Sequence, residues 1–281
     1  MATIDNLPVR TVEHGGLTIE GYSRAAVQSY WRIPELDVGF DLGGQPLHFA
    51  QTGNWFVSHC HLDHVAAIPM LVSRRRKLGL TPPRIYLPRT SVCDIEALLR
   101  GYAALDGGQL PCELIGLADR EDVELSPDHV VTAFATQHTV PSLGFLVWKR
   151  SSKLTPSIQN GTERETRPVS VSGLDTRDER RYPLVCYVGD SAPAGLDHFQ
   201  PLFEAQILIT ELTFVEPAHR RDRVHKYGHI HLDDLEERAS NYHNELIIAA
   251  HLTARTSRRR AEHLLDQRLP ASLRERLQLW A

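Results

Sequence analysis

The chain has 281 residues, of which 42% are hydrophobic, so it can bury a sizeable core in one large domain or in two small ones. Its formal net charge of −4 excludes a bulk basic field that binds nucleic acid indiscriminately, and any polyanion would need a local basic patch. The four cysteines lie far apart and form no Cys-x-x-Cys pair, which indicates free thiols in a reducing compartment.

The amino terminus and the apolar segments argue against export and membrane insertion. Residues 1–8 lack the basic start and the apolar core of a signal peptide. No apolar run approaches the length that spans a membrane. We therefore expect a cytoplasmic protein without a membrane partner.

The first predicted strands lead to a carboxylate. Residues 17–22 and 35–41 alternate apolar with polar or small residues, as half-buried strands do. The second strand ends in Asp41, which is either a support for a nearby site or an ordinary turn residue. The apolar run 55–57 then predicts the end of a buried strand, and residues 65–77 predict an amphipathic helix.

Between that strand and that helix lies a cluster of histidines, Ser58-His59-Cys60-His61-Leu62-Asp63-His64. Side chains alternate faces in an extended chain, so His59 and His61 point the same way and can bind one metal ion. Asp63 and His64 lie where the chain turns into the helix and could bind a second ion. Imidazole and carboxylate are ligands that borderline metals prefer, so we favour a metal site over surface histidines beside a helix cap.

The middle of the chain adds a candidate ligand. The expected elements there are a strand at 83–88, a helix from Thr90 or Ser91 to about Leu105, and strands at 130–135 and 143–148. His138 lies between the last two strands and is a candidate third ligand, with Ser142 in the same loop. Taken alone, His138 would more often be a hydrogen-bonded loop histidine, but its place downstream of the first cluster favours a ligand.

Residues 149–182 change character. They are rich in Ser, Thr, Arg and Glu without a clear period, which predicts an exposed arm inserted into a single domain that spans residues 1–281. Positions 149–181 carry eight basic and five acidic residues. That composition could contact phosphates but does not require it.

The last third of the chain repeats the pattern of a strand followed by a candidate ligand. A buried strand at 183–190 delivers Asp190 at its end, where open sheets place their sites. The other expected elements are a strand at 205–214 carrying Glu211, an irregular histidine-dense stretch at 219–231, a helix at 232–242, a strand at 245–250 ending at His251, and a helical segment at 257–280 broken at Pro270.

The cluster His59-x-His61-x-Asp63-His64 resembles the motif of the metallo-β-lactamase fold hydrolases, which implies an α/β fold: an αββα sandwich of two mixed sheets with helices outside. Within that superfamily the chain resembles ribonuclease Z from about residue 17 to residue 255. The matching stretches are His138-x-x-x-Ser142-x-Gly144, Gly189-Asp190-Ser191, Glu211-x-Thr213-Phe214, Gly228-His229 and His251-x-Thr253-x-Arg255. This resemblance implies an enzyme that cuts a phosphodiester bond at the 3′ side of precursor tRNA with two zinc ions.

The resemblance also implies roles for individual residues. One ion would bind His59, His61 and His138, the other would bind Asp63, His64 and His251, and Asp190 would be shared. The expected catalytic residues are Asp63, Glu211 and His229, of which Glu211 and His229 form the pair that protonates the leaving oxygen. The residues expected to support the ligands or the substrate are Asp41, Ser142, Thr253, Arg255 and His231. Zinc is the expected ion, manganese or iron could occupy the same ligands, and a second copy of the chain is the expected protein partner.

The sequence departs from the family pattern at three places. Thr210 replaces a histidine before the glutamate, and Ile230-His231 replaces Ser-Thr, so His231 is a rival proton donor to His229. The interval between His138 and Asp190 lacks the Gly-Pro pair of the family's RNA-gripping arm. Two alternatives therefore stay open: a metal-dependent hydrolase of small esters such as a cyclic nucleotide, lactone or aryl sulfate, and a noncatalytic binding protein on this fold.

Overall fold

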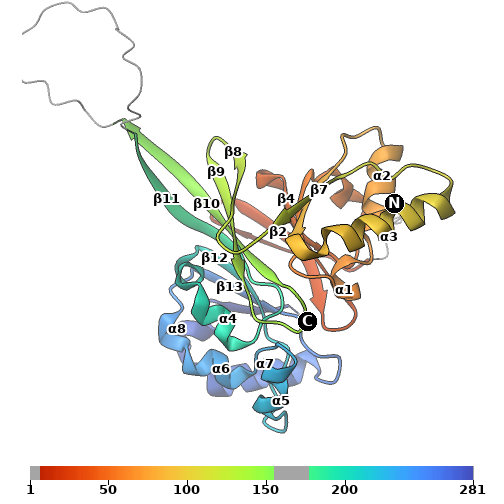
Figure 1. Cartoon of the computed structure of the whole chain (residues 1–281). Helices are drawn as coiled ribbons and strands as arrows, with labels where there is room; N and C mark the ends of the chain where they lie inside the picture. The colour runs from red at the N-terminus through yellow and green to blue at the C-terminus, as the bar shows by residue number, and fades with distance from the viewer. Residues whose placement is uncertain (1–6, 155–176, 281) are drawn as a thin grey trace, which may run out of the picture.

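The computed structural model describes residues 7–154 and 177–280, in which two mixed β-sheets of seven strands each form the centre (Figure 1). The first sheet has the order β1-β2-β3-β4-β5-β6-β7, antiparallel as far as β4 and parallel from there. Its strands are β1 (Arg10–His14), β2 (Leu17–Arg24), β3 (Gln28–Ile33), β4 (Val38–Leu42), β5 (Asn54–Phe56), β6 (Arg84–Pro88) and β7 (Glu113–Leu117).

The second sheet has the order β14-β13-β12-β11-β10-β9-β8 and the same division: β8 to β11 are antiparallel, and β11 to β14 are parallel. Its strands are β8 (Asp122–Ser126), β9 (His129–Ala135), β10 (Leu143–Leu154), β11 (Arg177–Tyr187), β12 (Ile207–Glu211), β13 (Leu246–Ala250) and β14 (Leu277–Leu279). Each half of the chain thus supplies one sheet with parallel strands whose carboxyl ends can carry a site.

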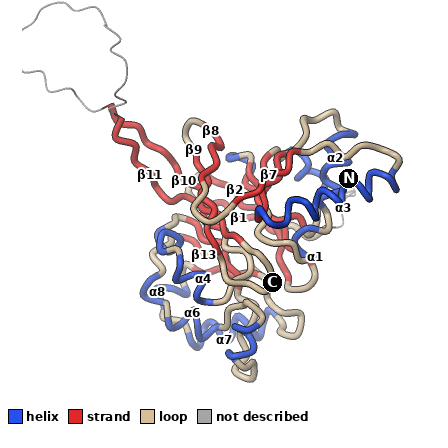
Figure 2. The backbone as a smooth tube through the Cα atoms, in the orientation of Figure 1, coloured by secondary structure: helices blue, strands red, loops and turns tan. Residues whose placement is uncertain are grey.

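Helices cover the outer face of each sheet (Figure 2). Those on the first sheet are α1 (Leu62–Val65), α2 (Ile68–Lys77) and α3 (Val92–Asp106). Those on the second are α4 (Pro193–His198), α5 (Arg221–Lys226), α6 (Leu232–Glu237), α7 (Arg258–Arg268) and α8 (Ala271–Arg274). Short 3₁₀ helices connect them at η1 (Pro34–Leu36), η2 (Leu47–Gln51), η3 (Arg89–Ser91), η4 (Gln200–Glu204) and η5 (Ala239–Asn241). This arrangement confirms the predicted αββα sandwich.

Three apolar layers hold the sandwich together. Between the sheets, Phe40 of β4 stacks on Tyr187 of β11 with ring centroids 5.0 Å apart. Outside the first sheet, α2 and α3 bury Leu71 and Leu99 against it, and outside the second, α7 buries Leu265. Each fully buried side chain of this kind contributes about 1.5–3 kcal/mol, so burial on both faces of both sheets fixes their mutual position.

Several predicted boundaries are wrong. The helix predicted at 65–77 is divided, because the Ala67 amide donates to the Leu42 carbonyl at 2.8 Å and Pro69, in the first turn of α2, has no amide to donate. The stretch predicted to be irregular contains α5, whose charged side chains hide any apolar period. The predicted carboxyl-terminal helix ends early, because Leu277 and Leu279 alternate into the core as β14. Sequence patterns missed β1, β3, β7, β8 and α4 altogether.

The predicted arm begins and ends as regular structure. Strands β10 and β11 continue their antiparallel pairing outward beyond the sheet, with Lys149 opposite Tyr182 and Arg150 opposite Arg181 (Figure 1). Residues 155–176, in the middle of the predicted arm, lie outside the described residues. Among the helices that the structure describes, none is long and apolar enough to cross a membrane.

Candidate metal centre

The predicted ligands meet at one edge of the sandwich. His59 and His61 follow β5, Asp190 follows β11, and His251 follows β13. His138 comes from the loop between β9 and β10, and Asp63 and His64 lie on α1. The segments that follow β5, β9, β11 and β13 therefore deliver all seven side chains to one place, and all but His138 come from the parallel parts of the sheets.

Two groups of ligand atoms form there. His59, His61 and His138 make the first group, in which Nδ1 of His61 lies 3.1 Å from Nε2 of each of the other two. Asp63, His64 and His251 make the second, with Nε2 of His64 and Nε2 of His251 3.4 Å apart.

Asp190 lies between the two groups. Its Oδ2 is 3.8 Å from Nε2 of His59 in the first group and 3.5 Å from Nε2 of His64 in the second. A single buried carboxylate thus faces both groups, which is the arrangement expected of a shared ligand.

The outer ring nitrogens of four histidines contact protein acceptors. Nδ1 of His64 lies 2.6 Å from Oδ2 of Asp41, and Nδ1 of His138 lies 2.9 Å from the Gly228 carbonyl. Nδ1 of His251 lies 3.1 Å from Thr213 Oγ1, and Nδ1 of His59 lies 3.0 Å from Ser58 Oγ. An imidazole that donates from Nδ1 keeps its Nε2 lone pair for a cation, so these contacts prepare the cluster for metal binding. The donor set therefore fits two divalent ions.

Asp41 organises this outer layer. Its buried carboxylate accepts hydrogen bonds from the Ser58 amide at 2.6 Å, the Ser58 hydroxyl at 2.8 Å, His64 and the Tyr187 hydroxyl. Asp41 is also in the left-handed region, with φ of 53°. Such a conformation costs a non-glycine residue about 1–3 kcal/mol and persists where the surroundings enforce it, as these four donors do here.

Burial and neighbouring charges set the protonation of the cluster. Burial and the charge of His64 hold the pKa of His59 well below its usual value, and burial also lowers the pKa of His61 and of His138. Burial opposes protonation of His64 as well, but Asp190 and Asp41 outweigh it and raise its pKa. Most of the ligand histidines are therefore neutral near pH 7, and a cation would displace a proton from His64.

The two carboxylate ligands are ionised. Burial alone would raise the pKa of Asp63, but its hydrogen bond with His251 and the charge of His64 lower it to about 2. Burial also opposes ionisation of Asp190, and the charges of His251 and His64 overcome that effect and lower its pKa well below the usual range. Both oxygen ligands carry the negative charge that a divalent ion requires.

Glu211 and His229 form a pair beside the cluster. Nδ1 of His229 lies 3.1 Å from Oε1 of Glu211 and 4.0 Å from Oδ2 of Asp190. Glu211 is buried and also accepts from the Ser191 amide at 2.8 Å and the Thr213 hydroxyl. Burial opposes protonation of His229, but the Glu211 carboxylate raises its pKa to about 9. His229 is therefore a protonated imidazole held in one orientation.

A cleft of about 450 Å³ opens onto this centre. Its floor includes His61, Asp63, Asp190, His229 and His251. Its walls come from the β2–β3 turn, from Thr213 and Phe214, and from residues 253–255. The metal centre is thus accessible to a ligand from solvent along one side.

The predicted supporting residues divide into two sets. Thr253 and Arg255 line the cleft. Ser142 lies outside the cluster, where its hydroxyl accepts from Thr136 Oγ1 at 2.7 Å and closes the loop that carries His138. His231 is turned away from the cluster, because its Nε2 lies 3.0 Å from the Glu216 carbonyl and its Nδ1 accepts from the Asp233 amide.

The chain is 30% identical over 250 residues to the chloroplastic tRNase Z TRZ2 of Arabidopsis thaliana, a match that covers 87% of this chain and 70% of that protein. It is 28% identical over 264 residues to tRNase Z TRZ1 of the same plant, covering 93% and 94% of the two chains. The chain belongs to the ribonuclease Z (tRNase Z) family. No protein-family model matches the sequence.

The solved structures agree on the fold of this ribonuclease Z family member. The metallo-β-lactamase fold protein YhfI of Bacillus subtilis superposes with a TM-score of 0.59, at 15% identity, over 98% of this chain and 89% of that one. The predicted fold type and the predicted family are both confirmed.

The family departure at His231 has a structural explanation. His231 is the N-cap of α6: its side chain accepts from the Asp233 amide, while Asp234 accepts from the His231 amide at 2.8 Å. A threonine can cap a helix in the same way, so His231 does at this place what the family's threonine can do. Both ring nitrogens of His231 are engaged at this cap, and His231 is not among the residues that line the cleft with His229.

Sequence patterns missed part of the outer layer of this ribonuclease Z family site. Ser58 was next to the motif but had no ligand chemistry of its own, and Thr213 was only part of a matching stretch. Tyr187 reaches Asp41 across 146 positions of sequence, and no local pattern connects the two. Gly228 contributes through its carbonyl, which Nδ1 of His138 contacts. Glycine is favoured at this position because φ is 72° and because a Cβ would lie 2.4 Å from Nδ1 of His138.

Proposed function

We propose that this chain is a ribonuclease Z-type endonuclease that cuts a phosphodiester bond on the 3′ side of precursor tRNA and uses two divalent ions, zinc by preference. One observation carries the proposal: the two ligand groups that share Asp190 and the protonated His229–Glu211 pair open into the same cleft. Membership of the ribonuclease Z family supports RNA as the substrate.

The ligand groups define where the ions would be held. His59, His61 and His138 would hold one, Asp63, His64 and His251 the other, and Asp190 would contact both. Ions bound there would supply Lewis acidity for the phosphodiester and a nucleophile from water at neutral pH. Nitrogen-rich ligand sets favour zinc among the available divalent metals.

His229 would supply the proton for the departing oxygen. A general acid must be protonated at working pH and must lie within reach of the leaving group. Glu211 meets the first condition, because its carboxylate raises the pKa of His229 to about 9 against the effect of burial. The cleft meets the second, because His229 lines it beside Asp190.

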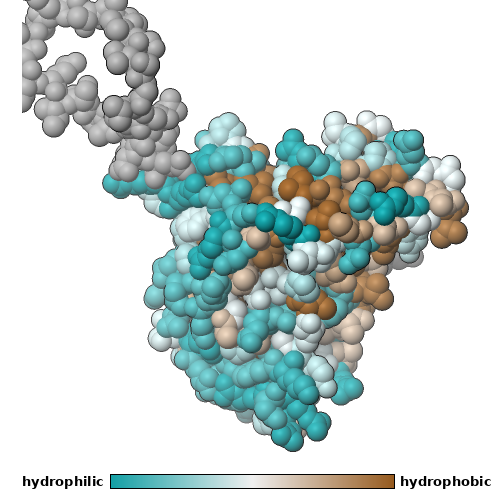
Figure 3. Space-filling model, in the orientation of Figure 1, coloured by the Kyte–Doolittle hydropathy of each residue, from teal (hydrophilic) through white to brown (hydrophobic). Residues whose placement is uncertain are grey.

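The α2–α3 face supports a homodimer as the assembly. Leu98, Tyr102 and Leu105 repeat at helical spacing along α3 and are exposed, Leu105 by 87%. Met70 of α2 is exposed on the neighbouring helix, and Figure 3 shows apolar surface over this end of the molecule. Contiguous exposed apolar surface of this kind is typical of protein interfaces, and a second copy of the chain would cover it.

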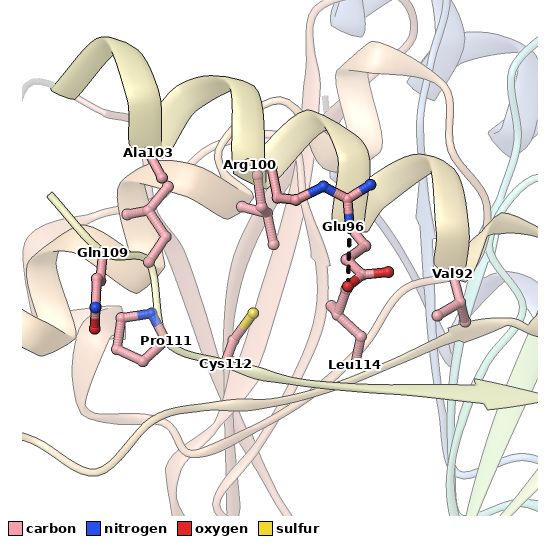
Figure 4. Close-up of a pocket in the computed structure, with 10 residues that line it drawn as sticks. Val92, Glu96, Arg100, Ala103, Gln109, Pro111, Cys112 and Leu114 are labelled. Carbon is pink, nitrogen blue, oxygen red and sulfur yellow. Dashed lines mark ion pairs between the residues drawn. The ribbon is translucent and has the colours of Figure 1, made fainter. Parts of the chain in front are cut away.

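A cavity on the same face adds to this surface. It measures about 560 Å³, and its lining includes Leu99 and Ala103 of α3 together with Cys112 and Leu114 at β7. Figure 4 shows α3 beside this strand, with Ala103, Cys112 and Leu114 labelled. The ion pair between Arg100 and Glu96, 3.1 Å apart, lies at its side. Light scattering would show a dimer that Leu105→Glu converts to a monomer, whereas Tyr227→Glu, at an exposed residue after α5 on the other sheet, would leave it a dimer.

The thiols support a reducing compartment such as the cytoplasm. Cys60, Cys93, Cys112 and Cys186 are all free. Burial raises the pKa of Cys186 well above its usual value and that of Cys112 to about 11, so both remain unreactive thiols.

The test of the proposed function is cleavage of a 3′-extended precursor tRNA by the metal-loaded protein, beside an aryl phosphodiester. Cleavage at one defined 3′ position supports the proposal, with Asp190→Ala as the inactive control. Hydrolysis of the aryl phosphodiester alone would keep the chemistry and reject tRNA as the substrate. If the metal-loaded protein hydrolyses neither substrate, the proposal that it is a phosphodiesterase is rejected.

A further inference from the structure

Four arginines line the cleft or lie within four residues of its lining in sequence, in a chain whose net charge is −4. Arg255 lines the cleft, and Arg24 directly precedes the lining residues Ala25 and Ala26. Nη2 of Arg24 donates to the Thr256 carbonyl at 3.1 Å, which joins these two walls. Arg258 and Arg259 follow as the first two residues of α7. We call Arg24, Arg255, Arg258 and Arg259 the cationic rim.

The cationic rim has little countercharge. Within residues 7–154 and 177–280, no carboxylate forms an ion pair with Arg24, Arg255 or Arg259. Arg258 has only Glu262, at 3.6 Å, and Arg274 holds that carboxylate more closely at 2.7 Å. The next arginine, Arg260, differs because it pairs with Glu216 at 3.1 Å. The rim charges are therefore available to an anion from solvent.

The placement of these charges is unfavourable for the protein alone. The first turn of α7 contains arginines and no acidic residue. Cations there oppose the helix dipole, whose positive end lies at the amino terminus of the helix. Arg10 adds to the crowding, because its burial and the nearby charge of Arg258 lower its pKa. An anion bound along this rim would relieve the repulsion.

We propose that the cationic rim binds backbone phosphates of the RNA strand that occupies the cleft. The inference rests on the proposed function, because it takes the strand at the metal centre as its starting point. The rim charges come from two segments, the end of β2 and residues 255–259, and the contact between Arg24 and the Thr256 carbonyl places the two segments side by side at the cleft. This arrangement suits successive phosphates of a polynucleotide, and guanidinium groups bind phosphate without reading base sequence.

The experiment compares Arg258→Ala/Arg259→Ala with the wild-type enzyme on both substrates. For 3′-extended tRNA we expect KM to rise at least about tenfold. The slope of log KM against log salt concentration should decrease by about 0.7–0.9 for each arginine that is replaced. Hydrolysis of the aryl phosphodiester should not change, because that substrate has no flanking phosphates. The matched control is Arg84→Ala/Arg89→Ala, which removes two exposed arginines from the first sheet and its η3 turn and should leave both substrates unaffected.

A second measurement tests phosphate binding by the cationic rim independently of the proposed cleavage activity. Fluorescence anisotropy gives the affinity for the same tRNA in an Asp190→Ala background, with and without the two arginine substitutions. In one outcome, the wild type fails to cut tRNA while replacement of the two arginines still weakens tRNA binding and the salt dependence of that binding. This result would reject the proposed function and support phosphate binding by the cationic rim. If these substitutions change neither the affinity for tRNA nor its salt dependence, the proposal that the cationic rim binds phosphates is rejected. An equal loss of activity on the aryl phosphodiester would also reject it.

Discussion

Nδ1 of His64 lies 2.6 Å from Oδ2 of Asp41, and both side chains are completely buried. This contact orients one ligand of the second group, and the same carboxylate reaches His59 of the first group through Ser58. The Asp41→Asn substitution keeps the shape of the side chain, but its NH₂ group is a donor and would face other donors that need an acceptor. We expect metal affinity to fall about 10–100-fold, as measured by competition with a chelator.

The control for this prediction is Asp119→Asn. Asp119 is an exposed carboxylate that also contacts a histidine, with Nε2 of His198 3.2 Å away, but it lies outside the cluster. Its substitution should leave metal affinity unchanged. Equal metal affinity in Asp41→Asn and the wild type would show that Asp41 is only a turn residue.

Asp190 faces both ligand groups with the same carboxylate oxygen. Asp190→Ala removes a buried charge within 4 Å of His59 and His64 and leaves the histidines to repel one another when protonated. We expect less than two ions per chain by elemental analysis and no detectable hydrolysis of either substrate. Full activity in this variant would contradict the two-ion arrangement.

His229 should determine the alkaline side of the pH–rate profile. Its pKa is raised to about 9, so the proton that it donates is present at lower pH and is lost as the pH rises through that value. Bound divalent ions add positive charge and lower the pKa, so we expect kcat to decline from a midpoint at or below pH 9. His229→Ala should lower kcat by about 10²–10⁴ with metal content retained, and the alkaline decline should disappear. An unchanged decline in that variant would assign it to another group.

The clustering of the candidate ligands could be predicted from sequence because each follows a strand whose apolar run is visible locally. His138, Asp190 and His251 are separated by long intervals, yet β9, β11 and β13 run in the same direction and bring their carboxyl ends to one edge. The sequence left two roles open for Asp41, a support for the site or a turn residue. Its contact with His64 depends on a left-handed backbone angle as well as on its position, and the sequence does not reveal that angle.

The roles of Tyr187 and His231 could not be predicted. The Tyr187 hydroxyl donates to Asp41 because the two sheets pack face to face, a relationship that no local period encodes. His231 has the chemistry of a ligand or an acid, and only the start of α6 at the next residue, Leu232, makes it a cap. Residue type indicates what a side chain can do, while tertiary packing decides which neighbour it meets.

Asp234 holds the segment that carries His229. Its buried carboxylate accepts from Nε2 of His225 and from the His231 amide, both at 2.8 Å, and from Arg221. These contacts join α5 to α6 on either side of His229. Asp234→Asn should lower kcat with KM nearly unchanged, and should reduce the free energy of unfolding by about 1–3 kcal/mol.

The matched control for Asp234 is Asp222→Asn on α5. Asp222 is exposed, and within residues 7–154 and 177–280 its ion pair is with Arg220 at 2.7 Å, so its loss should change neither kcat nor stability measurably. Asp234→Asn with unaltered kcat would show that the α5–α6 contacts stabilise the fold without positioning His229.

His231 provides the last prediction, because its two possible roles give opposite results. As the N-cap of α6 it satisfies the Asp233 amide, so His231→Ala should reduce the free energy of unfolding by about 1 kcal/mol in denaturant melts. His231→Thr restores a capping oxygen and should recover most of that stability. Both variants should keep the kcat and the pH profile of the wild type, since His231 points away from the cleft toward the Glu216 carbonyl. A proton donor would instead lose activity in both variants, and the threonine would not rescue it.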